Sequence, residues 1–217
     1  MTGSPNSAGT GNGGPTSPLA ASGVVSRPER SETGVWVGIA AISMSFAAFT
    51  SAMIVRQGAS PDWRHFQLPG ILYLNTLILL ASSCTLRIAR GRLGSIRAAF
   101  AEAPGAAARR YSDGLHWLYV TAALGALFIV GQFLAWRNLA AQGLFLATNP
   151  SSSFFYVFTA IHALHLLGGI GGLAYIIRKF ARTNGTARAT GMNAVSIYWH
   201  FMDGLWVYLF LLLAMRT

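Results

Sequence analysis

The sequence alternates between five long apolar segments and shorter connections that carry nearly all of the charged residues. At a rise of about 1.5 Å per helical residue, each apolar segment can cross about 30 Å of hydrocarbon. Lone strands of this length would leave backbone groups unpaired in lipid, so helices are predicted. The pattern indicates an all-α, polytopic membrane protein built as a bundle of five transmembrane helices, with spans at about 34–55, 68–86, 117–136, 151–177 and 191–215.

The ends of these segments carry local signals. The second span is predicted to stop at Arg87 and to hold Pro69 in its first turn, where a missing N–H costs least. The fourth opens with three serines, 151–153, which are predicted to cap the helix. Residues 1–33 are rich in Gly, Ser, Pro and Thr and are predicted to be a disordered cytoplasmic tail before a membrane domain at 34–217.

The tail lacks the basic start and short apolar region of a signal peptide, so the first span is expected to be an uncleaved anchor. Basic residues then predict the orientation, because cytoplasmic connections carry the excess of Lys and Arg. Twelve of the 16 lie in the tail and in the second-to-third and fourth-to-fifth connections. A bacterial-type plasma membrane is predicted, with the N-terminus cytoplasmic and the C-terminus on the outer side.

Composition supports the same class of protein. Of the 217 residues, 53% are apolar and 10% are charged, too few charges for the surface of an ordinary soluble domain. The formal charge of +10 is spread over connections rather than gathered on one folded face, which disfavours nucleic acid as a partner. A single cysteine, Cys84, excludes an internal disulfide and multi-cysteine metal sites.

Candidate chemistry is confined to the last two spans. His162 and His165 stand at i and i+3 on the fourth, and His200 and Asp203 have the same spacing on the fifth. Asp203 is the one carboxylate inside an apolar run, so it should face the protein interior and have a hydrogen-bonding partner.

Three hypotheses fit this polar set. The histidines could ligate a haem or metal in an electron carrier, or Asp203 could serve a proton or ion pathway in a small transporter. Alternatively, Asp203 accepts a hydrogen bond from a His, Trp or Tyr in a structural network that fixes one helix against another. Gly168 and Gly172 have the spacing that lets two helix backbones approach closely, and Asn75 and Gln132 are expected to join helices by hydrogen bonds.

Taken together, the segments from Gly34 to Met215 resemble subunit III of the haem–copper respiratory oxidases. The similar motifs are Leu-Asn-Thr at 74–76, Ser-Ser-Cys-Thr at 82–85, the Phe-Phe to His-Leu-Leu-Gly-Gly stretch at 154–169, and Tyr-Trp-His-Phe-Met-Asp at 198–203 with Trp206. The chain departs from the family where members often carry Glu, because by alignment these positions hold Ile42 and Ala135. It resembles the short form with five spans in place of seven.

The resemblance implies a subunit of a cytochrome c oxidase-type complex with no catalytic site, cofactor or metal of its own. Haem and copper would lie in the partner subunit I, which this chain would stabilise while binding membrane phospholipid and supporting proton uptake. A quinol oxidase subunit III and a nitric oxide reductase accessory protein are the alternatives within the family. The structural network implied for such a subunit consists of His162, His165, Tyr198, Trp199, His200 and Asp203.

Overall fold

The computed structural model describes residues 30–59, 69–94, 103–146, 149–183 and 191–216. Within these ranges the chain forms five helices, each long and apolar enough to cross a membrane, which confirms the all-α five-helix prediction. The helices are α1 (Arg30–Ala59), α2 (Ile71–Gly94), α4 (Pro104–Ala141), α5 (Pro150–Thr183) and α6 (Met192–Arg216).

The helices extend beyond the predicted spans, most clearly at the end of α2. This helix does not stop at Arg87 but continues to Gly94, two turns further. A transmembrane helix needs apolar residues only at the depth of the hydrocarbon, and arginines continue it readily at the level of the head groups. The extension of α2 is held by Arg92, whose guanidinium contacts Asp113 of α4 at 2.6 Å.

The first helix also starts earlier than predicted. α1 begins at Arg30, so residues 30–33, which were assigned to the disordered tail, are helical. Glu32 lies in its first turn, where a negative charge is favourable to the helix dipole. The predicted disorder of residues 1–29 lies outside the described residues.

The expected serine cap of the fourth span is wrong. Pro150 is the first residue of α5, and its fixed φ suits the start of a helix. The serines therefore lie inside the first turn, where the Ser152 hydroxyl donates to the carbonyls of Asn149 and Phe145, each at 2.9 Å. Pro69 likewise precedes α2 instead of lying in its first turn, and its carbonyl accepts from the N–H of Leu72 at 3.0 Å.

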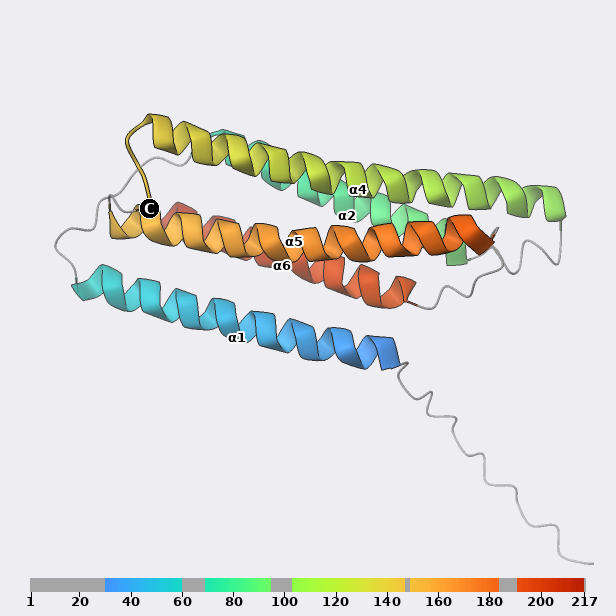
Figure 1. Ribbon diagram of the computed structural model, residues 1–217, viewed down its shortest axis with the longest axis horizontal. Coiled ribbons are helices and arrows are strands. Elements are labelled where there is room, and N and C mark those ends of the chain that lie inside the picture. The colour runs from blue at the N-terminus through green and yellow to red at the C-terminus, as the bar shows by residue number, and fades with distance from the viewer. Residues whose placement is uncertain (1–29, 60–68, 95–102, 147–148, 184–190, 217) are drawn as a thin grey trace, which may run out of the picture.

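The five helices form a bundle in which α1 is peripheral. Figure 1 shows α2 and α4 lying together along one side and α1, in blue, on the opposite side, with α5 and α6 between them. Among the described helices α1 contacts only α5 and α6, whereas α2 and α4 form the most extensive pair. The core is filled by aromatic side chains, and Trp199, Trp206, Phe128, Phe155 and Phe158 are all fully buried.

Candidate functional site

Polar side chains occupy the interior of the bundle at several depths. Four helices contribute to this set, and α1 contributes none among the described residues. The buried polar residues are Asn75, Ser82, Thr121, Gln132, Ser151, Ser152, Thr159, His162, Ser196 and Asp203. In a membrane interior such groups are costly unless they are paired, so their partners indicate what they do.

One group joins α2, α4 and α6 through hydroxyls. The Trp199 indole N–H donates to Ser82 Oγ at 3.1 Å, and the Ser82 hydroxyl is 3.4 Å from the Thr121 carbonyl oxygen. The hydroxyls of Thr85 and Thr121 share a further hydrogen bond of 2.8 Å. These bonds satisfy the one polar atom of a fully buried Trp and fix three helices against one another.

The two ionisable residues of α6 have different surroundings. His200 is half-buried, and its Nδ1 hydrogen-bonds Ser83 Oγ of α2 at 2.6 Å. Asp203 is 5% exposed, and neither of its carboxylate oxygens has a hydrogen-bond partner among the described residues, although the Ser83 side chain lies beside it. The predicted bond to Asp203 from a His, Trp or Tyr is therefore wrong.

The donors expected for Asp203 are used elsewhere. Trp199 donates to Ser82, and the Trp206 indole donates to Thr76 Oγ1 at 3.0 Å. The Tyr198 hydroxyl crosses to α5 and donates to the carbonyl oxygen of His165 at 2.9 Å. Indole and phenol groups on one helix face in different directions, and spacing along the chain does not show which acceptor each one reaches.

The two histidines of α5 are also separate. His162 is fully buried and packs against the rings of Phe128 and Trp206, with centroids 5.8 and 5.1 Å away, and neither ring nitrogen has a partner among the described residues. His165 Nδ1 donates to the carbonyl of Ile161 at 2.8 Å, and its ring packs near Phe46. The six predicted residues are thus distributed over four places: Trp199 with Ser82, His200 and Asp203 beside Ser83, Tyr198 with His165, and His162 against two aromatic rings.

The three histidines of the last two helices do not converge on one point. His162, His165 and His200 face different partners, and the described residues contain no group of three His, Cys, Asp or Glu side chains that could hold a metal ion. Ligation of a metal ion by side chains alone needs several donors around one point. A metal ion held jointly by these three histidines therefore does not fit the described part of the chain.

The residues predicted to join helices do not make the contacts that were expected of them. Asn75 and Gln132 are buried, yet neither side chain has a hydrogen-bond partner in the described ranges. Gly168 and Gly172 face α6, where an added Cβ would make ordinary contacts at 3.9 Å with Tyr198 and 3.5 Å with Val195. The closest approaches are instead at Gly114, Gly125 and Gly131, all on α4.

Sequence reasoning assigned no structural role to the hydroxyls of Ser82, Ser83, Thr85 and Thr121. The first three lie within the Ser-Ser-Cys-Thr motif, where two neighbouring serines serve different helix contacts: Ser82 bonds Trp199 and Ser83 bonds His200. A run of hydroxyl residues inside an apolar span is the available signal, because such side chains are enriched at contacts between membrane helices.

We expect Asp203→Asn to leave the free energy of unfolding of the chain in detergent unchanged, or to raise it by about 1 kcal/mol. The amide keeps the shape of the side chain and removes a carboxylate that lacks a hydrogen bond among the described residues. Denaturant titration would measure this. Asp113→Asn, which removes the exposed partner of Arg92, is the control and should cost at most about 1 kcal/mol. A loss of about 1–3 kcal/mol in Asp203→Asn would instead indicate a hydrogen-bonded carboxylate.

Comparison with known proteins gives a consistent result across the membrane domain. The family model described as cytochrome c oxidase subunit III matches residues 41–216, which reach from α1 to the end of α6. The cytochrome c oxidase subunit 3 of Thermostichus vulcanus is 30% identical, with 88% of this chain and 89% of that protein covered.

Two further relatives come from distant bacteria. The probable cytochrome c oxidase subunit 3 of Mycobacterium bovis is 29% identical, and the alignment covers 86% of this chain and 88% of the relative. The cytochrome c oxidase subunit 3 of Synechocystis is also 29% identical, with 85% and 75% covered. The similarity therefore extends over most of each chain and is not confined to one motif.

Proposed function

Because the chain belongs to the cytochrome c oxidase subunit III family, we propose that it is a non-catalytic subunit that stabilises subunit I of a proton-pumping terminal oxidase. It is a multi-pass membrane protein and a subunit of a haem–copper oxidase. The observation that carries the proposal is the family match over residues 41–216, which includes all five helices. The complex would reduce oxygen to water with electrons from cytochrome c, the donor after which the related oxidases are named.

In this proposal haem and copper belong to subunit I. The three histidines of α5 and α6 support that division, since each one makes a separate packing or hydrogen-bond contact. His200 bonds Ser83, His165 bonds the backbone of its own helix, and His162 packs against two aromatic rings. They serve as structural residues, as does the buried Trp199.

Assembly with subunit I and with phospholipid is supported by the apolar outer surface of the bundle. Large side chains such as Leu74, Leu77, Leu164 and Leu211 are more than half exposed, which in a membrane protein means contact with lipid or with a neighbouring subunit. α1 is the least covered helix, with 17% of its apolar stretch buried against 33–39% in the other four.

If this subunit supports proton uptake by the oxidase, it does so without carboxylates at positions 42 and 135. Ile42 of α1 is 8% exposed and Ala135 of α4 is fully buried, so both lie in apolar packing where related proteins often carry Glu. We propose that this subunit supports uptake indirectly, by holding the structure of subunit I and its lipid, and not by carrying protons through these two side chains.

The orientation is proposed from one end of the bundle. Here Asn193 of α6 donates to Glu32 of α1 at 3.2 Å and accepts from Arg90 of α2 at 2.8 Å. At the same end Tyr111 of α4 donates to the Phe180 carbonyl of α5 at 2.6 Å. This end also holds most of the basic residues, and we propose that it faces the cytoplasm, across a bacterial plasma membrane.

Purification of the tagged full chain in a mild detergent tests the proposed function. We expect subunit I to co-purify, which an absorption spectrum would detect through its haem and elemental analysis through its copper. The control is the same tagged chain expressed in cells that lack subunit I, which should yield neither signal. Recovery of the chain alone under several gentle conditions, from cells that produce the oxidase, would contradict the proposal.

A further inference from the structure

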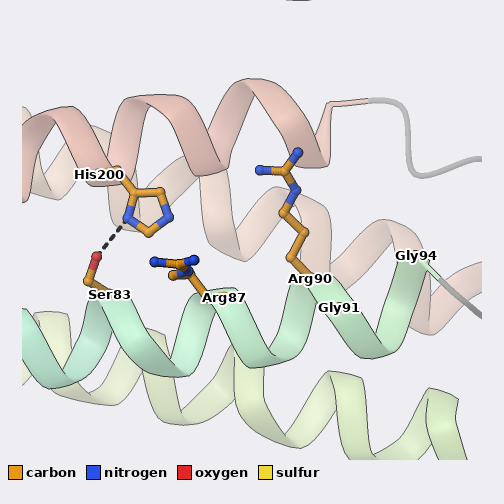
Figure 2. A pocket seen from close by; sticks show the side chains of 6 residues that line it. All are labelled: Ser83, Arg87, Arg90, Gly91, Gly94 and His200. Atoms are coloured by element: carbon orange, nitrogen blue, oxygen red, sulfur yellow. Dashed lines mark hydrogen bonds between the residues drawn. The ribbon is translucent and has the colours of Figure 1, made fainter.

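A hollow lies between α2 and α6 at the basic end of the bundle. Its volume is about 590 Å³, and its lining combines cationic side chains with residues that have no side chain. Figure 2 shows two arginine side chains rising from α2 toward the helix that carries His200, with two glycines further along α2. The lining residues are Ser83, Arg87, Arg90, Gly91, Gly94 and His200.

The two arginines differ in their partners. Arg90 is held by α6, because its Nη2 donates to Asn193 Oδ1 at 2.8 Å and its Nη1 lies 3.4 Å from Ser196 Oγ. Arg87 is exposed to the hollow and forms no hydrogen bond or ion pair with any described residue. Its neighbour Arg92 shows the contrast, since it is paired with Asp113. The Arg87 guanidinium is therefore free to bind an anion that enters the hollow.

Acidic side chains do not fill this role within the described residues. Glu32 is linked to Arg90 only through the Asn193 amide, so its carboxylate bonds the amide and not the guanidinium. Asp203 lies one turn from His200 on α6 and beside Ser83, but it is buried in the bundle and is not part of the lining of the hollow. The hollow therefore presents excess positive charge.

The shape of the hollow depends on the glycines. At Gly91 and Gly94 an added Cβ would meet nothing within 4 Å, so both positions border open space. On the opposite wall the bond between Ser83 Oγ and His200 Nδ1 occupies that ring nitrogen and fixes the ring, which leaves Nε2 as the imidazole atom able to bond a ligand. With the Ser83 hydroxyl donating to Nδ1, Nε2 carries the proton, and this N–H together with two arginines one turn apart on α2 can donate to several oxygens of one anion.

We propose that the hollow formed by Ser83, Arg87, Arg90, Gly91, Gly94 and His200 is a binding site for a phosphate group. Phosphate fits better than a carboxylate, because its tetrahedral oxygens can accept from both arginines and the imidazole at once. The phosphate could belong to a phospholipid head group, whose acyl chains would lie along exposed residues of α2 such as Leu80 and Ile88, or could be free in solution. The site gives a defined set of residues to the lipid binding proposed above. Binding of phosphate at this site does not require subunit I.

The test uses the purified full chain in a neutral detergent with two probes. Native mass spectrometry would measure binding of dioleoyl phosphatidylglycerol, with dioleoylglycerol as the matched lipid that lacks the phosphate. Isothermal titration calorimetry would measure binding of inorganic phosphate. We expect one of the two phosphate probes to bind the wild-type chain. Binding of phosphatidylglycerol identifies a head-group site, and binding of inorganic phosphate identifies a site for the free ion.

Two variants locate the site. Arg87→Gln should weaken binding about tenfold or more, as expected for lost charge-assisted hydrogen bonds. Gly91→Leu fills the hollow without changing the charge and should weaken binding by a similar factor. The matched controls are Arg182→Gln, in a second basic cluster on α5, and Gly171→Leu, at an exposed glycine with equally open surroundings; both should bind as the wild type does.

Several results would overturn the proposal. These are binding of neither phosphate probe, binding of dioleoylglycerol as tight as that of phosphatidylglycerol, and an equal loss in the control variants. Unchanged binding in Gly91→Leu would also exclude the hollow, and this variant remains informative if Arg87→Gln does not fold. An acidic side chain of another subunit found in the hollow of the purified oxidase would show that the arginines serve assembly instead. None of these results depends on the co-purification experiment.

Discussion

Replacing Trp199 by alanine should lower the free energy of unfolding by about 3–5 kcal/mol. The indole is fully buried and lies between α4 and α5. A Cβ added at Gly125 would be 2.9 Å from its Cη2, and one added at Gly169 would be 3.5 Å from its Cε3. Packing of this kind, more than the hydrophobic effect, holds membrane helices together, so the cavity left by alanine removes contacts from both neighbours.

Denaturation in mixed micelles with increasing dodecyl sulfate, followed by circular dichroism, would measure the loss. Trp199→Phe separates packing from hydrogen bonding, because it keeps an aromatic ring and removes only the N–H that bonds Ser82. We expect Trp199→Phe to cost much less than alanine. Trp36→Ala on α1 is the control for a Trp that is 57% exposed, and it should change stability little. Equal losses at Trp199 and Trp36 would show that the indole does not hold the helices together.

The helices were predictable because the membrane restricts what the sequence can do. Apolar length and the need to satisfy backbone groups leave the helix as the one regular structure for these segments. Helix ends were less predictable, as α2 shows. Arg87 marks where the apolar run stops, but the helix continues to Gly94, since arginine is a good helix former and its side chain can reach the head groups.

The sequence indicated which residues of the spans are polar and buried, but it did not indicate their partners. Burial of Asp203 and His162 followed from their place in apolar spans, but their partners depend on how each helix is rotated about its axis. That rotation is set by contacts between distant residues, such as Trp199 with Ser82 or Trp206 with Thr76. A spacing of i and i+3 places two side chains on one face and does not show which helix that face meets.

The glycines show the same limit. The spacing of Gly168 and Gly172 drew attention to one face of α5, yet an alanine at either position would make only ordinary contacts. The tightest positions, Gly114, Gly125 and Gly131 on α4, face large or polar side chains of other helices. Whether a glycine is required depends on the size of the residue opposite, which a motif within one helix does not contain.

Gly131→Ala should lower the free energy of unfolding by about 1–3 kcal/mol, because a single methyl group overfills the contact between α2 and α4. A Cβ at this position would overlap Oδ1 of Asn75 and lie 2.9 Å from its Cγ, so the amide would have to move. Asn75 is fully buried, with a short side chain on the helix that makes the most extensive contact with α4, and it has little room to do so.

A double-mutant cycle tests this explanation directly. Asn75→Ala removes the obstructing amide, and the described residues contain no hydrogen bond to that amide that would be lost with it. Gly131→Ala should therefore cost little when introduced into Asn75→Ala, and the coupling energy should account for most of the loss seen in the single variant. Gly171→Ala, at an exposed glycine with open surroundings, is the control for adding a methyl group to a membrane helix. If Gly131→Ala costs as much in the Asn75→Ala background as alone, the strain does not arise at Asn75, and the close contact between α2 and α4 is held by other residues.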